Sequence, residues 1–464
     1  MTNRRLFLSA LGAAPFVWSP AAAQRQSGDT PKRDGRVMST RPFDIEMELD
    51  GFKNYLTPID RFYVRTHHFT PNMQADTFKL EVGGEVANKL TFTLDELKKM
   101  PAAELVSVCE CAGNGRALYE PPIVGLQWEY GAVGNARWRG VRLADVLKKA
   151  GVNPAGKYVL FNGGDTPVGK MPDFQRTIPL AKAMEMNTLL AYEMNGETLP
   201  VSHGFPLRVV VPGWAGDCWV KWLTNITILD KEFDGFFMKT AYRHPGKAVT
   251  PGVAVDPAQM KPVESLHIKS VIAAPLDGSA IKPGTPTRIS GVAWSGMSPV
   301  ARVEVSIDRG RTWKPATLGA DKHPFGWRQW HFDWTPSSTG HYNLMARARD
   351  IAGDTQPFEQ EWNPSGYLWN VVHRVAVDVT EAPVAKPAAS PAPPAQDASP
   401  GSALFREKCL ACHDDKPIAQ QRLTRAQWDR EVGKMTNWGA NVKPGDKDEI
   451  VDYLVKRFGP RPRR

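Results

Sequence analysis

Two cysteines and a histidine near the end of the chain have the spacing of a covalent haem site. They are Cys409, Cys412 and His413, in the pattern Cys-x-x-Cys-His. Thiols at this spacing can bond to the two vinyl groups of a haem while the adjacent histidine ligates the iron. A zinc site would need a second ligand pair nearby, and a thioredoxin-type motif would need a βαβ context. The sequence has neither, and it therefore predicts one covalently bound haem c.

Met435 is predicted to be the second axial ligand of the haem iron. It is the only methionine of residues 401–464. An ordinary core methionine is the alternative interpretation, and that is the commoner case in general. Met/His ligation raises the potential of a haem, which suits a group that accepts electrons.

A second cysteine cluster begins at Cys109 and continues through Cys111 into the small residues 112–115. A thiolate at the end of a strand, followed by small residues, can ligate a soft metal in a tight site. Five cysteines in all are too few and too clustered for a disulfide scaffold. For Cys109 and Cys218 we expect structural burial.

Several motifs, in order along residues 61–379, resemble the sulfite oxidase family of molybdenum enzymes. Cys-Ala-Gly-Asn at 111–114 resembles the cofactor-cysteine motif of that family, which implies that Cys111 is the protein thiolate on molybdenum. The longest match is His203–Gly213, with the sequence HGFPLRVVVPG. The resemblance implies a molybdenum–molybdopterin cofactor.

The resemblance also implies which residues line the site. The substrate pocket is predicted to contain Arg65, Arg116, Trp128 and Tyr242. The cofactor is predicted to contact Tyr63, Arg65, Thr66, His67, Cys111, Asp165, His203, Arg208, Val220 and Lys221. A molybdopterin brings a phosphate, which calls for Arg, Lys and His. Sulfite is a small dianion that suits planar guanidinium donors.

The sequence departs from the family pattern at one pocket position. Animal members carry a third pocket arginine within Trp-Asn-Leu-Arg-Gly, whereas this chain has Trp362–Gly366 with Ser365 at the matching place. Arg374 is one candidate replacement. The departure gives weight to a larger sulfur substrate, and the closer resemblance is to the bacterial branch of sulfite and sulfane dehydrogenases.

A chain of 464 residues is long enough for about three domains. Strand-like runs such as Leu105–Val108 alternate with helical stretches such as Leu143–Ala150, which predicts an α+β molybdopterin fold. Short strands with Gly and Pro between them follow, and they predict an immunoglobulin-like β-sandwich. The predicted parts are the α+β domain at 40–250, the sandwich at 255–381, an Ala/Pro linker at 382–400 and a small all-α cytochrome c domain at 401–464.

The N-terminal segment resembles a twin-arginine export signal. Arg4-Arg5 precedes a short apolar run, and Ala21–Ala23 offers a cleavage site, which places the signal at 1–23. The run is too short to span a bilayer, so we expect a soluble periplasmic protein without a membrane span. The net charge of +9 is mild for this length, and no nucleic-acid partner is expected.

Together these features predict a periplasmic sulfite dehydrogenase. Sulfite would be oxidised to sulfate at molybdenum, and the electrons would pass through the haem to an external cytochrome c. By resemblance, the sandwich would mediate a homodimer. The alternative within the same fold is a sulfane dehydrogenase that oxidises protein-bound sulfur in thiosulfate oxidation. A non-enzymatic electron carrier is disfavoured by the intact Cys111, His203, Arg208 and Tyr242 motifs.

Overall fold

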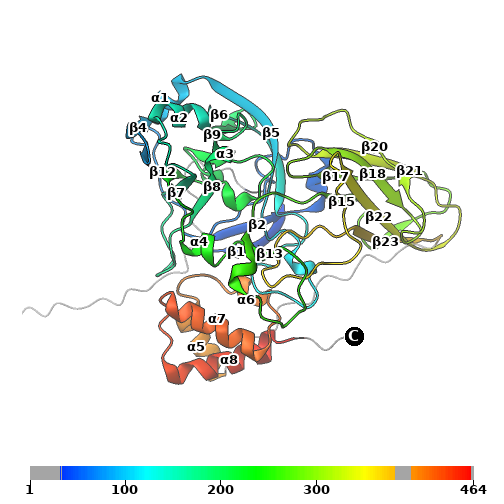
Figure 1. Cartoon of the computed structure of the whole chain (residues 1–464). Coiled ribbons are helices and arrows are strands. Elements are labelled where there is room, and N and C mark those ends of the chain that lie inside the picture. The colour runs from blue at the N-terminus through cyan, green and yellow to red at the C-terminus, as the bar shows by residue number, and fades with distance from the viewer. Residues whose placement is uncertain (1–31, 33, 382–398, 461–464) are drawn as a thin grey trace, which may run out of the picture.

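A computed structural model describes residues 32, 34–381 and 399–460. The predicted export signal and nearly all of the predicted linker lie outside these ranges. Figure 1 shows an α+β domain (34–250), a sandwich domain (255–381) beside it, and a helical domain (399–460) below the first. None of the helices in the described ranges is long and apolar enough to cross a membrane.

Two five-stranded sheets form the α+β domain. The first has the order β10-β9-β6-β5, with β11 paired to β9, and the second has the order β4-β3-β12-β7-β8. The first comprises β5 (Ala102–Glu110), β6 (Val133–Arg142), β9 (Leu189–Met194), β10 (Glu197–Thr198) and β11 (Arg208–Val210). The second comprises β3 (Lys79–Gly84), β4 (Leu90–Thr93), β7 (Tyr158–Gly163), β8 (Gln175–Pro179) and β12 (Leu223–Leu229).

Apolar side chains of both sheets share one core with the short helices. Leu80 and Val82 of β3 point inward while Lys79 and Glu81, which alternate with them, are exposed, as the period of two in a strand requires. The helices are α1 (Leu94–Lys99), α2 (Leu143–Ala150), α3 (Leu180–Ala183) and α4 (Phe236–Lys239). The α+β architecture expected from the sequence is therefore present.

A two-stranded hairpin precedes the two sheets in the sequence and contributes residues to the larger cavity described below. It consists of β1 (Gly35–Thr40) and β2 (Phe43–Met47), paired antiparallel. The domain was predicted to begin at residue 40, but β1 extends it toward the N-terminus. Two acidic residues of β2, Asp44 and Glu46, are buried, which is unusual for carboxylates unless they are paired.

The sandwich domain packs two sheets face to face. One has the order β15-β17-β21-β20, and the other has the order β16-β23-β22-β18-β19. Their strands are β15 (Lys269–Ala274), β16 (Ser279–Ile281), β17 (Thr287–Trp294), β18 (Val300–Ser306), β19 (Lys314–Pro315), β20 (Thr317–Leu318), β21 (Arg328–Trp334), β22 (Gly340–Asp350) and β23 (His373–Val379). Ile272, Ile289, Val303, Leu344 and Val375 belong to the core between the sheets. A short sheet of β13 (Arg243–Pro245) and β14 (Met260–Pro262) connects the two domains.

The helical domain contains α5 (Pro400–Cys409), α6 (Lys416–Ala419), α7 (Arg425–Asn437) and α8 (Pro444–Phe458). The predicted linker ended at Pro400, but the structure places Pro400 in the first turn of α5. Proline is favoured there because the missing N–H would have no helical partner. The core of the helical domain is small and centres on Phe405, Trp428 and Ile450. A core of this size needs reinforcement, which a covalent cofactor could supply.

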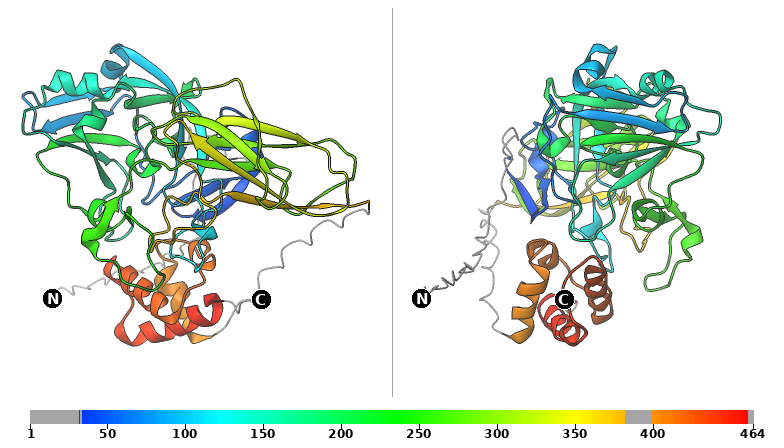
Figure 2. Two further views of the ribbon diagram at one scale, coloured as in Figure 1. Left: turned by 45° about the vertical axis from the view of Figure 1, so that its right-hand side comes forward. Right: turned by 90° about the vertical axis from the view of Figure 1, so that its left-hand side faces the viewer.

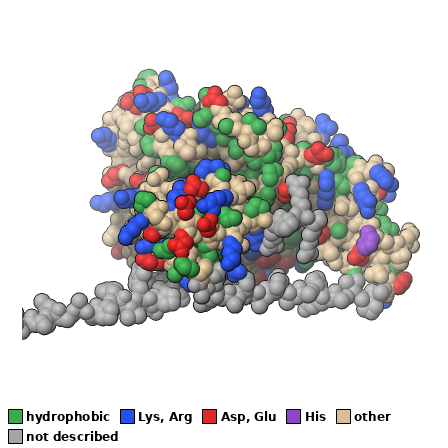
Figure 3. Space-filling view, turned by 90° about the horizontal axis from the view of Figure 1, so that it is seen from below, with side chains coloured by type: hydrophobic (Ala, Val, Ile, Leu, Met, Phe, Trp, Pro, Cys, Tyr) green, Lys and Arg blue, Asp and Glu red, His purple; other side chains and the backbone are tan. Residues whose placement is uncertain are grey.

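The helical domain lies against the α+β domain on the side of the β1–β2 hairpin. Both views in Figure 2 keep it below that domain, and α6 contacts β1. Seen from below, its outer face carries interspersed basic and acidic side chains (Figure 3). Pairs such as Lys447–Asp429 at 2.8 Å account for part of this pattern. Among the described residues, basic and acidic side chains are therefore mixed on this face.

Candidate functional site

One cavity of about 430 Å³ is shared by the α+β domain and the helical domain. From the α+β domain it is lined by the predicted pocket residues Arg65, Arg116, Trp128 and Tyr242, together with Cys111. From the helical domain it is lined by the predicted haem residues Cys409, Cys412, His413 and Met435. The fold thus brings both groups of predicted residues to one cavity, although they lie at opposite ends of the chain.

A smaller cavity of about 70 Å³ continues from the first into the α+β domain. Its lining contains the predicted cofactor residues Tyr63, Arg65, Thr66, His67, Cys111, Asp165, His203, Arg208 and Lys221. Arg65, Thr66, His67, Cys111 and Tyr242 line both cavities. Val220 is the exception, because its buried side chain lines neither cavity and its carbonyl accepts a bond from the Val209 amide at 2.9 Å.

Cys111 follows β5 directly and is fixed by the loop after it. Its amide donates to the Ala132 carbonyl at 2.9 Å, and the Asn114 side chain accepts from the Ala132 amide at 3.1 Å. Burial raises the pKa of the Cys111 thiol to about 11, against the opposing effect of Arg65 and Arg116. The bare thiol is therefore protonated at neutral pH, and metal coordination would be needed to hold it as a thiolate.

Glu110, next to Cys111, is bonded to the sandwich domain. Its carboxylate is paired with Lys269 on β15 and accepts from the Trp294 indole at 2.7 Å. The Asn114 amide also donates to it at 2.9 Å. Glu110 and Lys269 are both buried. Residues of the sandwich domain therefore hold the loop that carries Cys111.

Arg65 is oriented by Asp44 of the hairpin. A guanidinium nitrogen lies 3.1 Å from an Asp44 carboxylate oxygen, and the Thr66 amide donates to the other oxygen at 2.6 Å. Asp44 also lines the larger cavity. Asp44 could not be predicted as a site residue, because nothing in a short charged strand marks which carboxylate will be buried.

Arg116 is held by backbone carbonyls and an aromatic ring. Its guanidinium donates to Leu126 O at 3.2 Å and lies 5.1 Å from the centre of the Tyr367 ring. Ser365, at the position of the missing arginine, lines the cavity and contributes no cation. Arg374 does not replace it, because Arg374 donates to Phe358 O and does not line the cavity. Arg65 and Arg116 are therefore the arginines at the cavity among the described residues.

Tyr242 and His67 form a polar pair beside these arginines. The Tyr242 hydroxyl lies 2.8 Å from Nε2 of His67. Burial lowers the pKa of His67 well below its ordinary value and raises the pKa of Tyr242, so both are neutral at pH 7. The hydroxyl can then donate to Nε2. Tyr242 also stacks on Tyr367, with ring centres 5.2 Å apart.

Two cations that line the smaller cavity, buried Arg208 and half-buried Lys221, fit a phosphate-bearing cofactor. Arg208 donates to the carbonyls of His203 and Trp219, and Lys221 donates to Thr66 Oγ1 and to Ser202 O. Within the described ranges neither cation forms an ion pair with a carboxylate. Burial of an uncompensated cation is costly, so an anion at this position would be strongly favoured.

Lys221 leads to a prediction about pH. Burial, with Arg208 nearby, lowers the pKa of its ammonium to about 7 from 10.5. At a pH between these two pKa values, Lys221 is protonated in the unfolded chain and deprotonated in the folded cofactor-free protein. Its stability should therefore rise with pH across this interval and fall as the pH drops toward 7. The Tm of cofactor-free wild type should increase from pH 7 to pH 9 by more than that of Lys221→Met. An equal increase in both would contradict the assignment, and exposed Lys239→Met is the control.

The four predicted haem residues all line the larger cavity. Nδ1 of His413 donates to the Asp414 carbonyl at 2.7 Å, which leaves Nε2 free for a metal. Cys409 ends α5, Met435 lies on α7, and both line the shared cavity with Cys412. Two thiols, one available imidazole nitrogen and a thioether therefore share one cavity.

Sequence comparisons agree with the α+β and sandwich domains. Residues 67–237 match the family described as oxidoreductase molybdopterin binding domain, and residues 260–380 match the Mo-co oxidoreductase dimerisation domain. Sulfite oxidase from Gallus gallus is 35% identical over 379 residues, which cover 77% of this chain and 81% of that protein. The chain belongs to the sulfite oxidase family. The predicted molybdopterin-binding and dimerisation domains are thereby confirmed.

A second relative and a solved structure are also similar to this chain. Mitochondrial sulfite oxidase from Rattus norvegicus is 38% identical over 364 residues; the match covers 74% of this chain and spans 65% of that protein. The crystal structure of the sulfane dehydrogenase SoxCD from Paracoccus pantotrophus superposes with a TM-score of 0.63 at 27% identity. It covers 81% of this chain and 96% of that one.

Some site residues of this family member could not be found from its sequence. Arg176 and Asp217 form a buried ion pair of 2.7 Å, with the Arg176 guanidinium 5.3 Å from the Tyr242 ring centre. Asp217 lines the smaller cavity, and burial raises its pKa to about 6. These residues lie in different segments, and no spacing or motif connects them.

Proposed function

We propose that this protein oxidises sulfite to sulfate at a molybdenum–molybdopterin centre held by Cys111. The observation that supports this most is that Cys111 shares one cavity with Arg65 and Arg116. A metal-binding thiol beside two guanidinium groups is suited to a small sulfur oxyanion. Membership of the sulfite oxidase family supports the same reaction.

The residues around the cofactor have separate roles in binding the anion, orienting it and excluding water. When bound, the molybdenum centre supplies the oxygen-atom transfer and accepts the two electrons. Arg65 and Arg116 bind and orient the anion, with Arg65 held in place by Asp44. Tyr242 offers a hydroxyl directed by His67, and buried Trp128 excludes water from one wall. Overall, sulfite and water give sulfate, two protons and two electrons.

The electrons would leave through a haem c on the helical domain. Cys409 and Cys412 would attach it, and His413 with Met435 would ligate its iron. A haem carries one electron at a time, so two successive transfers to an external cytochrome c would complete a turnover. We propose that this takes place in the periplasm, by a homodimer formed through the sandwich domain.

A second candidate function is sulfane dehydrogenation of protein-bound sulfur. It is favoured by Ser365 at the position of the third arginine and by the structural similarity to a sulfane dehydrogenase. Fewer fixed cations leave room for a substrate that carries less charge at its reacting sulfur.

Turnover with three substrates side by side separates these functions. Purified holoprotein is given sulfite, thiosulfate or a carrier protein with a bound sulfane, and reduction of external cytochrome c is followed. The proposal expects the highest kcat/KM with sulfite. Cytochrome reduction that required the carrier-bound sulfane would assign the second function, and no increase above background with any substrate would contradict both.

Asp44→Asn should weaken anion binding at this site. The change keeps the size of the side chain but removes the charge that orients Arg65. Hydrogen bonds to charged groups contribute about 1.5–3 kcal/mol, so the KM for sulfite should rise by roughly ten- to a hundred-fold. Steady-state kinetics would measure this, with sulfate inhibition weakened in parallel. Asp333→Asn is the control, because Asp333 pairs with Arg288 on the surface of the sandwich. An unchanged KM in Asp44→Asn would remove Asp44 from this role.

A further inference from the structure

The backbone between the two haem cysteines is bonded to the β1–β2 hairpin. The Arg41 guanidinium donates to the carbonyl of Leu410 at 2.7 Å and to that of Ala411 at 2.8 Å. These are the two residues between Cys409 and Cys412. One side chain of the α+β domain therefore fixes the orientation of the whole haem-attachment loop.

A second contact from the hairpin reaches the residue that orients His413. The Asp414 carboxylate accepts from the Thr40 amide at 2.6 Å and also from the Thr40 hydroxyl. The carbonyl of the same Asp414 accepts from Nδ1 of His413. The hairpin thus holds the predicted iron ligand through a single intervening residue.

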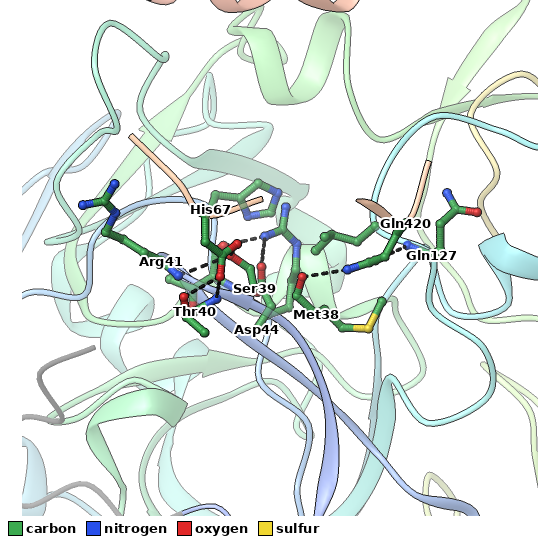
Figure 4. A network of polar contacts seen from close by, with 12 residues as sticks. Met38, Ser39, Thr40, Arg41, Asp44, His67, Gln127 and Gln420 are labelled. Atoms are coloured by element: carbon green, nitrogen blue, oxygen red, sulfur yellow. Dashed lines mark hydrogen bonds and ion pairs between the residues drawn. The ribbon is translucent and has the colours of Figure 1, made fainter. Parts of the chain in front are cut away.

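Two consecutive glutamines bond the end of α6 to the α+β backbone. Figure 4 shows Gln420 between Met38 and Gln127: its amide donates to Met38 O at 2.8 Å and accepts from the Gln127 amide at 3.2 Å. Gln421 donates to Gly125 O at 2.6 Å and accepts from the Gly125 amide at 3.3 Å. Each glutamine therefore uses both its donor and its acceptor across the interface.

A third region of contact lies beyond the end of α7. The Trp438 carbonyl accepts from the Lys170 amide at 2.7 Å, and the Trp438 ring lies 5.8 Å from that of Phe236. The interface therefore has three separated points of attachment, namely the hairpin, the loop at 125–127 and the loop at 170. Three separated directional contacts fix both the position and the orientation of a body.

The hairpin also connects the haem site to the anion site. Asp44 on β2 orients Arg65, while Thr40 and Arg41, before β2, hold Asp414 and the haem-attachment loop. Both sites face the shared cavity. A single short hairpin therefore contacts both sites.

We infer that the β1–β2 hairpin is the docking site, or seat, of the helical domain. It holds that domain in one position while electrons are transferred from the anion site to the haem. In this arrangement electrons pass from the anion site to the haem without movement of the helical domain. The inference rests on the proposed function for the identity of the electron carrier, but the seat itself is defined by the contacts of Arg41, Thr40 and Gln420.

Hydrogen–deuterium exchange of the full-length holoprotein tests the seat without reference to activity. The Thr40, Gly125, Gln127 and Lys170 amides all donate to acceptors in the helical domain. Peptides that contain them should exchange slowly in wild type and at least about tenfold faster in Arg41→Ala/Gln420→Ala. The matched control is Arg374→Ala/Gln74→Ala. It also removes one arginine and one glutamine side chain, but both lie away from the interface, so these exchange rates should not change. Exchange as fast in wild type as in the docking variant would overturn the seat.

The viscosity dependence of haem reduction tests the second half of the inference. Holoprotein is mixed with sulfite in buffers of increasing sucrose concentration, and the haem absorbance is followed. The wild-type rate should be independent of viscosity, whereas the rate of the docking variant should fall as viscosity rises. A wild-type rate inversely proportional to viscosity would overturn exit from a fixed domain. If sulfite reduced no haem at all, the proposed function would fail, and the exchange experiment would still decide whether the seat exists.

Discussion

Cys111→Ser should abolish sulfite turnover while leaving the haem spectrum intact. Serine is nearly the same size, but its oxygen is a harder ligand that stays protonated, so it is a poor substitute for a thiolate on molybdenum. Changes to residues that only orient a metal ligand cost about 10–100-fold. Loss of the ligand itself should cost more than that. Sulfite-dependent cytochrome c reduction measures the loss, and molybdenum content and the haem spectrum are measured on the same sample.

Cys218→Ser is the matched control for this change. Cys218 is also a buried thiol, but it lies beside Arg176 and lines neither cavity. Its replacement should therefore leave turnover within a few-fold of wild type. If Cys111→Ser kept the turnover of the control, Cys111 would have no part in the mechanism.

Lys269→Met should destabilise the protein strongly. The change leaves the Glu110 carboxylate buried without its charged partner. Removal of one partner of a buried ion pair costs about 3–5 kcal/mol, because the remaining charge is no longer compensated. Denaturant unfolding followed by tryptophan fluorescence would show the loss. Because Glu110 adjoins Cys111, we also expect the variant to retain less molybdenum after purification.

Arg288→Met provides the comparison for Lys269→Met. Arg288 also pairs with a carboxylate in the sandwich domain, but that pair is exposed. Water and salt screen the charges of an exposed pair, so this variant should unfold close to wild type. Equal stability of the two variants would show that the Glu110–Lys269 pair does not hold the two domains together.

The parts of the site that are local in sequence could be predicted. The prediction of a haem depends on the spacing of Cys409, Cys412 and His413, which one short segment contains. Cys111 and His203–Gly213 lie in contiguous motifs, and Cys111, His203 and Arg208 line the cavities. The α+β and sandwich domains followed from strand and helix periodicity, which burial on one face dictates.

The parts that depend on tertiary contacts could not be predicted. Thr40 meets Asp414, 374 positions further along the chain, and no periodicity records such a contact. Asp44, Arg176 and Asp217 are buried charges whose partners come from other segments. Val220 was predicted to contact the cofactor, yet its side chain lines neither cavity, because a resemblance in sequence specifies a segment and not which side chain faces the ligand. The start of the first domain was misplaced because β1 precedes every recognisable motif.

The most direct test of electron transfer from the Cys111 site to the haem is reduction of the haem by sulfite without any external acceptor. Holoprotein with full molybdenum and haem is mixed with sulfite under anaerobic conditions, and the haem absorbance is recorded against Cys111→Ser. We expect sulfite to convert the wild-type haem to its reduced form and to leave that of the variant oxidised. A wild-type haem that stayed oxidised, or equal reduction in both proteins, would contradict it.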